Sequence, residues 1–318
     1  MKWKFYSLAF VAGMSILTAC SSDDNNDNDG NGGNGNGNEI ENGTILKGTI
    51  TSDVTLAAGN TYKLSGEYIV EEGATLHIEE GVKIIAVYDD IADYILVKQG
   101  GKINAVGTPD KPIVMTSEKE EPGAWGGIHI CGRAHTNAEG GKGSSEIGGA
   151  VYGGNDDADN SGTLQYIRLE YTGFAFDEEH EANGISFYGV GNGTIVDHCQ
   201  AYKGSDDGFE FFGGSVNVSN LVAVSCSDDS FDWTEGWNGK GTNLVAYQED
   251  KSTLGYDCDC LMECDNNGSN NAATPVAHPV LKNLILVGNG GSKQGIRLRA
   301  GTEVEIDKKA YPYEIRNN

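Results

Sequence analysis

The chain has 318 residues, of which 46 are glycine and only 6 are proline, and its formal net charge at pH 7 is -25. So many glycines predict tight turns between short strands rather than a set of long helices. A charge this negative repels nucleic acid and anionic lipid head groups. The sequence therefore predicts no nucleic-acid partner and favours a divalent cation or a neutral glycan.

The first twenty residues have the organisation of a targeting segment. A positively charged start precedes an apolar run over residues 5–17, which is too short to span a membrane. The run ends in "LTAC", which resembles a bacterial lipobox; this resemblance implies cleavage before Cys20 and attachment of lipid to its thiol. We therefore expect residues 1–19 to be a lipoprotein signal peptide and the mature protein to be held at a membrane by lipid on Cys20.

Residues 20–42 are rich in Asn, Gly and Asp and contain almost no apolar side chain, so we expect them to form a disordered tether. The acidic residues that follow the lipidated cysteine resemble the export signal of surface lipoproteins in Bacteroidota-type bacteria. That resemblance implies an outer-membrane protein whose folded part, residues 43–318, lies on the cell surface. Retention in the periplasm is the alternative.

The folded part repeats a short pattern of an apolar, a polar and an apolar residue. The pattern returns at intervals of 24, 22, 31 and 34 residues, starting at Ile185, Phe209, Phe231, Met262 and Ile296. A second set of apolar positions, Val196, Leu221, Leu244 and Leu284, returns with it. Each repeat therefore carries at least two short strands.

Short strands cannot bury an apolar face alone, so the repeats must stack on one another to form a core. Parallel strands in repeats of this length, without helices between them, predict an all-β fold, a parallel β-helix solenoid. Residues 134–162 break the repeat with a Gly-rich stretch that is too long to be a coil. We expect this stretch to be a side loop.

Several segments, among them "VGTPDKPIVMTS", "PGAWGGIHICGRA", "SDDGFEFFGG" and "GIRLRAG", occur in this order along the chain. Together they resemble the right-handed parallel β-helix surface lipoproteins of Bacteroidota, a pectin-lyase-like group, over about residues 45–302. The resemblance implies the fold and the cell-surface location, but no particular activity.

The middle residue of each triplet should point outward from the core, since the two apolar residues point inward. Stacking then places five residues in one outward column: Ser186, Glu210, Asp232, Glu263 and Arg297. A second acidic column should form at the preceding turn, where Asp206 would stack with Asp228 and Asp207 with Asp229. Carboxylates about 5 Å apart repel one another unless a cation or a raised pKa offsets the repulsion.

These columns allow three interpretations. Carboxylate oxygens are hard ligands that suit calcium, so Asp206 and Asp228 are candidate calcium ligands. Paired carboxylates also suit a glycoside hydrolase or a lyase, and the candidate catalytic residues are Asp207, Glu210, Asp229, Asp232 and Arg297. Alternatively, the acids only form turns and keep the solenoid soluble.

Part of the catalytic interpretation depends on a resemblance to polygalacturonases, which share the β-helix. Asp206-Asp207 resembles their Asp-Asp motif, and "GIRLRAG" at Arg297 is similar to their Arg-x-Lys motif. However, Arg299 stands where that motif has Lys. The two other polygalacturonase motifs, Asn-Thr-Asp and Gly-His-Gly, are missing. For a lyase, Arg297 or Lys203 could serve as the base.

Other residues are candidates for metal or ligand binding. Asp157 and Asp159 in the side loop resemble the first half of a calcium loop, and His180 lies in an acidic cluster over residues 177–181. Tyr188 and Trp237, if exposed beside acids such as Glu263, would form a sugar-binding surface. Trp233 should face the core.

Six further cysteines follow Cys20, and we expect them to be buried thiols or to form a loop disulfide. Taken together, the sequence predicts a lipid-anchored cell-surface β-helix that binds glycan or another extracellular ligand without turnover. A polysaccharide hydrolase or lyase is the first alternative, and a structural spacer is the second. No cofactor other than calcium is predicted.

Overall fold

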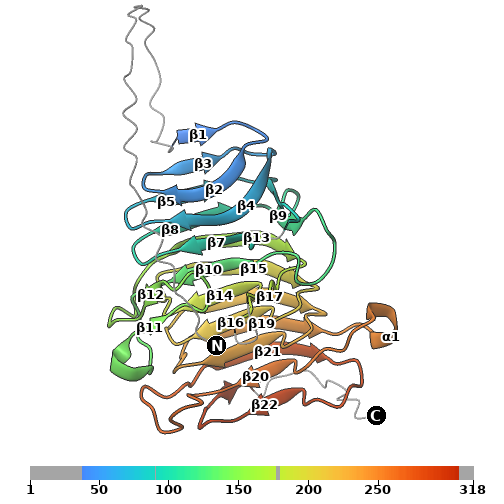
Figure 1. The fold of residues 1–318 in the computed structure, drawn as a ribbon. Helices are drawn as coiled ribbons and strands as arrows, with labels where there is room; N and C mark the ends of the chain where they lie inside the picture. The colour runs from blue at the N-terminus through green and yellow to red at the C-terminus, as the bar shows by residue number, and fades with distance from the viewer. Residues whose placement is uncertain (1–37, 90, 177–179, 308–318) are drawn as a thin grey trace, which may run out of the picture. The chain divides into compact units, whose positions relative to one another are not determined.

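The computed structural model describes residues 38–89, 91–176 and 180–307. These residues wind through successive coils that stack into a parallel β-helix (Figure 1), so the predicted all-β solenoid is confirmed. In this part of the chain the only α-helix is α1 (Lys251–Leu254), and a single 3-10 turn covers Glu139–Gly141. No helix among these residues is long and apolar enough to cross a membrane.

Each coil contributes to three parallel sheets, numbered so that the chain passes repeatedly from sheet 1 to sheet 2 to sheet 3, although the first described strand lies in sheet 2. Sheet 1 contains the C-terminal parts of β2 (Ile45–Ile50) and β4 (Thr61–Val70), then β7 (Tyr94–Val97), β10 (Ile128–Cys131), β14 (Ile185–Tyr188), β16 (Phe209–Phe212), β18 (Phe231–Thr234), β20 (Met262–Cys264) and β22 (Ile296–Leu298).

Sheet 2 contains β1 (Asn38–Ile40), β3 (Val54–Leu56), β5 (Thr75–Ile78), β8 (Lys102–Val106), the N-terminal parts of β13 (Gly162–Glu170), β15 (Ile195–Tyr202), β17 (Asn217–Val224), β19 (Lys240–Tyr247) and β21 (Val280–Val287), and β23 (Glu305–Ile306). Sheet 3 contains the N-terminal parts of β2 and β4, then β6 (Lys83–Ala86), β9 (Ile113–Ser117) and the C-terminal parts of β13, β15, β17, β19 and β21.

The long strands β17, β19 and β21 turn from sheet 2 into sheet 3 at a single asparagine each. Asn220, Asn243 and Asn283 have φ angles of 54°, 58° and 55°, a left-handed conformation that asparagine tolerates better than most residues. Their side-chain amides form a ladder, in which Asn243 donates to Asn220 at 2.7 Å and Asn283 donates to Asn243 at 2.9 Å. The ladder fixes the same corner in successive coils.

The core lies between the three sheets and consists of inward side chains stacked from coil to coil. Phe209 stacks on Phe231 with ring centroids 5.5 Å apart, and Trp233 is buried as predicted. The second set of apolar positions predicted from the sequence is confirmed for Leu221, Leu244 and Leu284, which pair in register. Val196 was assigned to this set wrongly: it pairs with Val218, because the bend within each long strand separates two inward rows.

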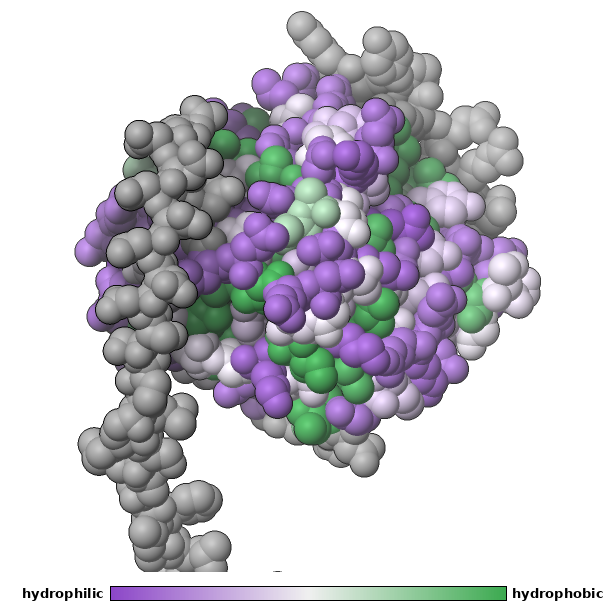
Figure 2. Space-filling model, turned by 90° about the horizontal axis from the view of Figure 1, so that it is seen from above, coloured by the Kyte–Doolittle hydropathy of each residue, from purple (hydrophilic) through white to green (hydrophobic). Residues whose placement is uncertain are grey.

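The first coil begins earlier than the sequence predicts. β1 lies within the stretch expected to be tether, because its backbone pairs with β3 and Ile40 packs against the core. Figure 2 shows the molecule from this end, with hydrophobic residues lying between hydrophilic ones. The signal peptide, Cys20 and the remainder of the tether lie outside the described residues.

The insertion predicted at residues 134–162 forms a side loop with a short antiparallel pair, β11 (Gly143–Ser144) and β12 (Val151–Tyr152). The loop lies against the outer face of sheet 1, where it forms a second hydrophobic cluster. Loop residues Ile147, Ala150 and Tyr152 pack there with Leu96, Tyr188 and Phe212 of the sheet. The outer face of sheet 1 was predicted to point into solvent, and this is wrong for its middle coils because the loop covers them.

The six cysteines from Cys131 to Cys264 are all free and buried. This confirms the interpretation as packed thiols rather than as a disulfide. Burial raises the pKa of Cys199 and Cys226 to about 12.

Candidate functional site

The predicted outward column of sheet 1 forms in register. Ser186 pairs with Glu210, Glu210 with Asp232, Asp232 with Glu263, and Glu263 with Arg297. The column also extends one coil further than predicted, because His129 pairs with Ser186. The repeated triplets therefore predicted these neighbours correctly, although the loops between them differ in length.

The upper part of this column opens into a pocket of about 190 Å³ that is lined entirely by acidic residues. They come from the side loop, from the segment before β14, from the turns before β16 and β18, and from those two strands. The lining residues are Glu146, Glu181, Asp206, Asp207, Glu210, Asp228 and Asp232. We refer to this set as the acidic pocket.

Sequence reasoning missed Glu146, since nothing in the side loop repeats and so nothing places it in a column. Glu181 was noted only as part of the acidic cluster at residues 177–181. Within that cluster, residues 177–179 lie outside the described part of the chain. Burial raises the pKa of Glu146, and the charge interaction with His180 offsets only part of this rise.

The carboxylates of the pocket are crowded, and five of the seven are buried or half-buried, whereas Glu181 and Asp228 are exposed. Asp206 is 9% exposed and Asp207 is 6% exposed. Burial, together with repulsion from neighbouring carboxylates, raises the pKa of Asp206 to about 8 and that of Glu146 to about 7. The same two causes raise the pKa values of Asp207, Glu210 and Asp232 well above their usual range.

Little within the described chain offsets this negative charge. None of the seven carboxylates forms an ion pair with a lysine or arginine among the described residues. Asn183 donates to Glu210 Oε2 at 2.6 Å, and the Tyr188 hydroxyl donates to Glu146 Oε2 at 3.3 Å. Asp232 Oδ1 is buried without any hydrogen-bond partner among the described residues, so the pocket retains unused hydrogen-bond acceptor capacity.

Two groups of three carboxylates in the pocket bring their oxygens within 4.8 Å of one another. One group is Asp206, Asp207 and Asp228, and the other is Asp207, Glu210 and Asp232. Asp207 belongs to both groups. Carboxylate oxygens gathered in this way have the chemistry of a site for a hard divalent cation.

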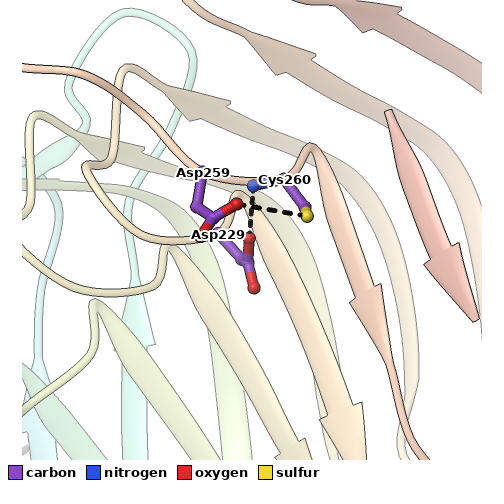
Figure 3. A group of neighbouring side chains, drawn as sticks. All are labelled: Asp229, Asp259 and Cys260. Carbon is purple, nitrogen blue, oxygen red and sulfur yellow. Dashed lines mark hydrogen bonds between the residues drawn. The ribbon is translucent and has the colours of Figure 1, made fainter. Parts of the chain in front are cut away.

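Asp207 and Asp229 also have a structural task in the turns. The Asp207 N–H donates to Asn183 Oδ1 at 3.1 Å, the Asp229 N–H to Asp207 Oδ1 at 2.8 Å, and the Cys260 N–H to Asp229 Oδ1 at 2.6 Å. Figure 3 shows the last of these bonds, and beside it the Cys260 thiol, which donates to Asp259. Each side chain thus caps the next coil, and Asp229 lies outside the acidic pocket.

The last coil carries a basic residue at the end of each acidic column. Lys293 pairs with Asp259, Arg297 pairs with Glu263 at 2.7 Å, and Arg299 contacts both Glu263 and Asp265. The prediction that Arg297 neutralises part of the column is confirmed. Because Arg297 and Glu263 form an ion pair, the unpaired negative charge of the column lies in the preceding coils, at the acidic pocket.

Several other candidates do not reach the pocket. Asp157 accepts from His135 at 2.6 Å and Asp159 accepts from the Arg133 N–H at 3.1 Å, so both hold the side loop in place. Neither belongs to a group of potential metal ligands among the described residues. Lys203 pairs with Glu249 at 3.0 Å.

The expected exposure of the two aromatic candidates is wrong. Tyr188 is 0% exposed because the side loop covers it. Trp237 is 1% exposed because its ring stacks on Phe211, with centroids 4.1 Å apart, and its Nε1–H donates to the Val216 carbonyl. Neither ring is placed to form a sugar-stacking surface.

Residues 48–311 match the model of a protein family described as a pectate-lyase like beta helix domain. The match agrees with the parallel sheets and shows the right-handed parallel β-helix that the sequence predicts. No curated protein matches the chain significantly.

Proposed function

The chain belongs to the pectate-lyase-like beta helix family, and we propose that it is a lipid-anchored cell-surface protein whose acidic pocket binds calcium and, through it, an extracellular ligand. The observation that carries the proposal is the large excess of negative charge in the pocket. Seven carboxylates line it, none is paired with a lysine or arginine of the described chain, and one of their buried oxygens has no partner.

The cost of holding charged carboxylates close together in the pocket explains why a cation should bind there. Buried carboxylates close to one another either take up protons or bind a cation, because the charged forms are poorly hydrated and repel each other. Calcium takes six to eight oxygen ligands and accepts irregular geometry. The residues that would hold it are Asp206, Asp207, Glu210, Asp228 and Asp232.

A ligand would complete the coordination sphere. Water or sugar hydroxyl groups supply the oxygens that calcium prefers beyond the carboxylates. None of the residues lining the pocket is aromatic, so a glycan bound there would depend on the cation rather than on ring stacking. The protein would then bind its ligand without turnover.

Calcium titration of the purified protein by isothermal calorimetry tests this proposal. We expect saturable binding that weakens about tenfold or more in Asp232→Asn, since a neutral amide replaces one charged ligand. Asp110→Asn is the matched control, because Asp110 is exposed and lies outside the pocket. Equal affinity in the two variants, or no binding at millimolar calcium, would contradict the proposal.

A polysaccharide hydrolase is the second candidate. It is favoured by Glu210 and Asp232, which are adjacent in register and belong to one group of oxygens within 4.8 Å, a closeness that suits the paired carboxylates of a retaining enzyme. Reducing-sugar release that disappears in Glu210→Gln and in Asp232→Asn would establish this function. Binding without release would leave the binding function in place.

A further inference from the structure

A second cavity lies on a different sheet from the acidic pocket. It is a groove of about 510 Å³ over the outer face of sheet 2, in the coils that contain β3, β5 and β8. Its volume falls within the range of about 300–1,000 Å³ that is usual for ligand sites. The lining residues are Thr55, Ala58, His77, Ile78, Glu79, Glu80, Asn104, Val106 and Thr108.

The floor of the groove is a row of three polar side chains in register. Thr55 pairs with His77, and His77 pairs with Asn104, so the three lie one strand spacing apart. Among the described residues, neither the His77 imidazole nor the Asn104 amide has a hydrogen-bond partner within the protein. Both groups can donate and accept hydrogen bonds, so they remain free for a ligand.

The wall of the groove is held by bonds within the protein. Glu79 Oε2 accepts from the Ala58 N–H at 2.9 Å, and Glu80 pairs with Lys111 at 2.8 Å. Glu79 can still accept further hydrogen bonds, since a carboxylate has about four lone-pair sites. Two carboxylates and no lysine or arginine line the groove, so the groove disfavours an anionic ligand.

One end of the groove is apolar. Val106 is 41% exposed, and it follows Asn104 on the same face of β8. An apolar side chain beside a row of hydrogen-bond donors and acceptors is complementary to a ligand that has C–H faces and many hydroxyl groups.

We infer that this groove is a binding site for a neutral saccharide. His77, Asn104 and Glu79 bind its hydroxyl groups, and Val106 contacts the C–H face of a ring. The site shares no residue with the acidic pocket and contains no group of potential metal ligands among the described residues. Saccharide binding here is therefore independent of calcium, and this inference does not depend on the proposed function.

Nuclear magnetic resonance tests the inference directly, because the chain has only 6 histidines and the His77 imidazole signal can be assigned from His77→Ala. Cellotetraose, mannotetraose and maltotetraose serve as neutral probes, and trigalacturonate serves as the anionic one, all in the presence of EDTA. We expect at least one neutral tetrasaccharide to shift the His77 signal saturably, and trigalacturonate to leave it unchanged.

Affinity is then measured by calorimetry in His77→Ala, in Asn104→Ala and in the matched control Lys102→Ala, which changes an exposed residue of β8 outside the groove. Each groove variant should bind about tenfold more weakly, and the control should bind as the wild type does. Melting temperatures of all variants exclude a folding defect. The inference is overturned if no neutral probe shifts His77, if only trigalacturonate binds, if EDTA abolishes binding, or if folded groove variants keep full affinity.

Discussion

The Asp229 backbone N–H donates to the side-chain Oδ1 of Asp207, which lies one coil earlier, at 2.8 Å. Asp207 is at the same time one of the most buried carboxylates of the acidic pocket. One side chain therefore stabilises the turn by accepting a hydrogen bond and destabilises the pocket by adding negative charge. These two effects can be separated by substitution.

We predict that Asp207→Asn and Asp207→Ala change stability differently. Asparagine retains the Oδ1 acceptor and removes the charge, so Asp207→Asn should match or exceed the wild type when calcium is absent. Alanine leaves the buried Asp229 N–H unpaired, and the free energy of unfolding should fall by about 1–3 kcal/mol. Urea unfolding in EDTA measures both variants, and an equal loss in both would mean that the hydrogen bond contributes nothing.

The acidic pocket should make stability depend on pH. Burial and neighbouring carboxylates raise the pKa of Asp206 to about 8 and that of Glu146 to about 7, against about 3.9 for an unperturbed Asp and about 4.3 for an unperturbed Glu. Between these values the folded protein binds more protons than the unfolded chain, so stability is full at low pH and falls as pH rises toward 8. We therefore expect the melting temperature in EDTA to be higher at pH 5 than at pH 8.

The effect of calcium on the melting temperature should also depend on pH. Calcium should raise the melting temperature at pH 8, where the carboxylates are charged, and much less at pH 5, where protons occupy the same oxygens. Asp232→Asn should reduce both the pH dependence and the calcium effect. A melting temperature in EDTA that rises from pH 5 to pH 8 would contradict this description of the pocket.

The repeats explain how much could be predicted from sequence. Glu210, Asp232 and Glu263 occupy the same place in equivalent triplets, and equivalent places stack in a solenoid whatever the loops between them do. The fold and the outward column follow from this rule alone.

The remainder of the site depends on segments that do not repeat. Glu146 reaches the pocket from the side loop, whose path no period specifies, and the same loop buries Tyr188. Trp237 follows a turn, and its burial depends on Phe211 from another coil. The groove residues His77 and Asn104 are in register but have different side chains, so no repeated residue type marked them.

We predict that Arg299 and Glu263, at the C-terminal end of the acidic column, contribute jointly to stability. Arg299 contacts Glu263 and also Asp265, the latter at 2.7 Å. Arg299→Met should destabilise the protein by about 1–3 kcal/mol, because it leaves partly buried carboxylates without their cation. The loss should be smaller when Glu263→Gln is also present, since the charge is then gone. Urea unfolding of the four proteins gives the coupling energy, and additive effects would show that the pair does not interact.

The asparagine corner gives the last prediction. Asn243 has a φ of 58°, donates to Asn220 and accepts from Asn283. Asn243→Ala loses both hydrogen bonds and places a β-carbon in the left-handed conformation, whereas Asn243→Gly loses the bonds without that strain. We expect both variants to lower the free energy of unfolding, by about 1–3 kcal/mol for glycine and by about 1 kcal/mol more for alanine. Urea unfolding measures the difference. If alanine were the less damaging of the two, the left-handed conformation would not be what selects asparagine at this corner.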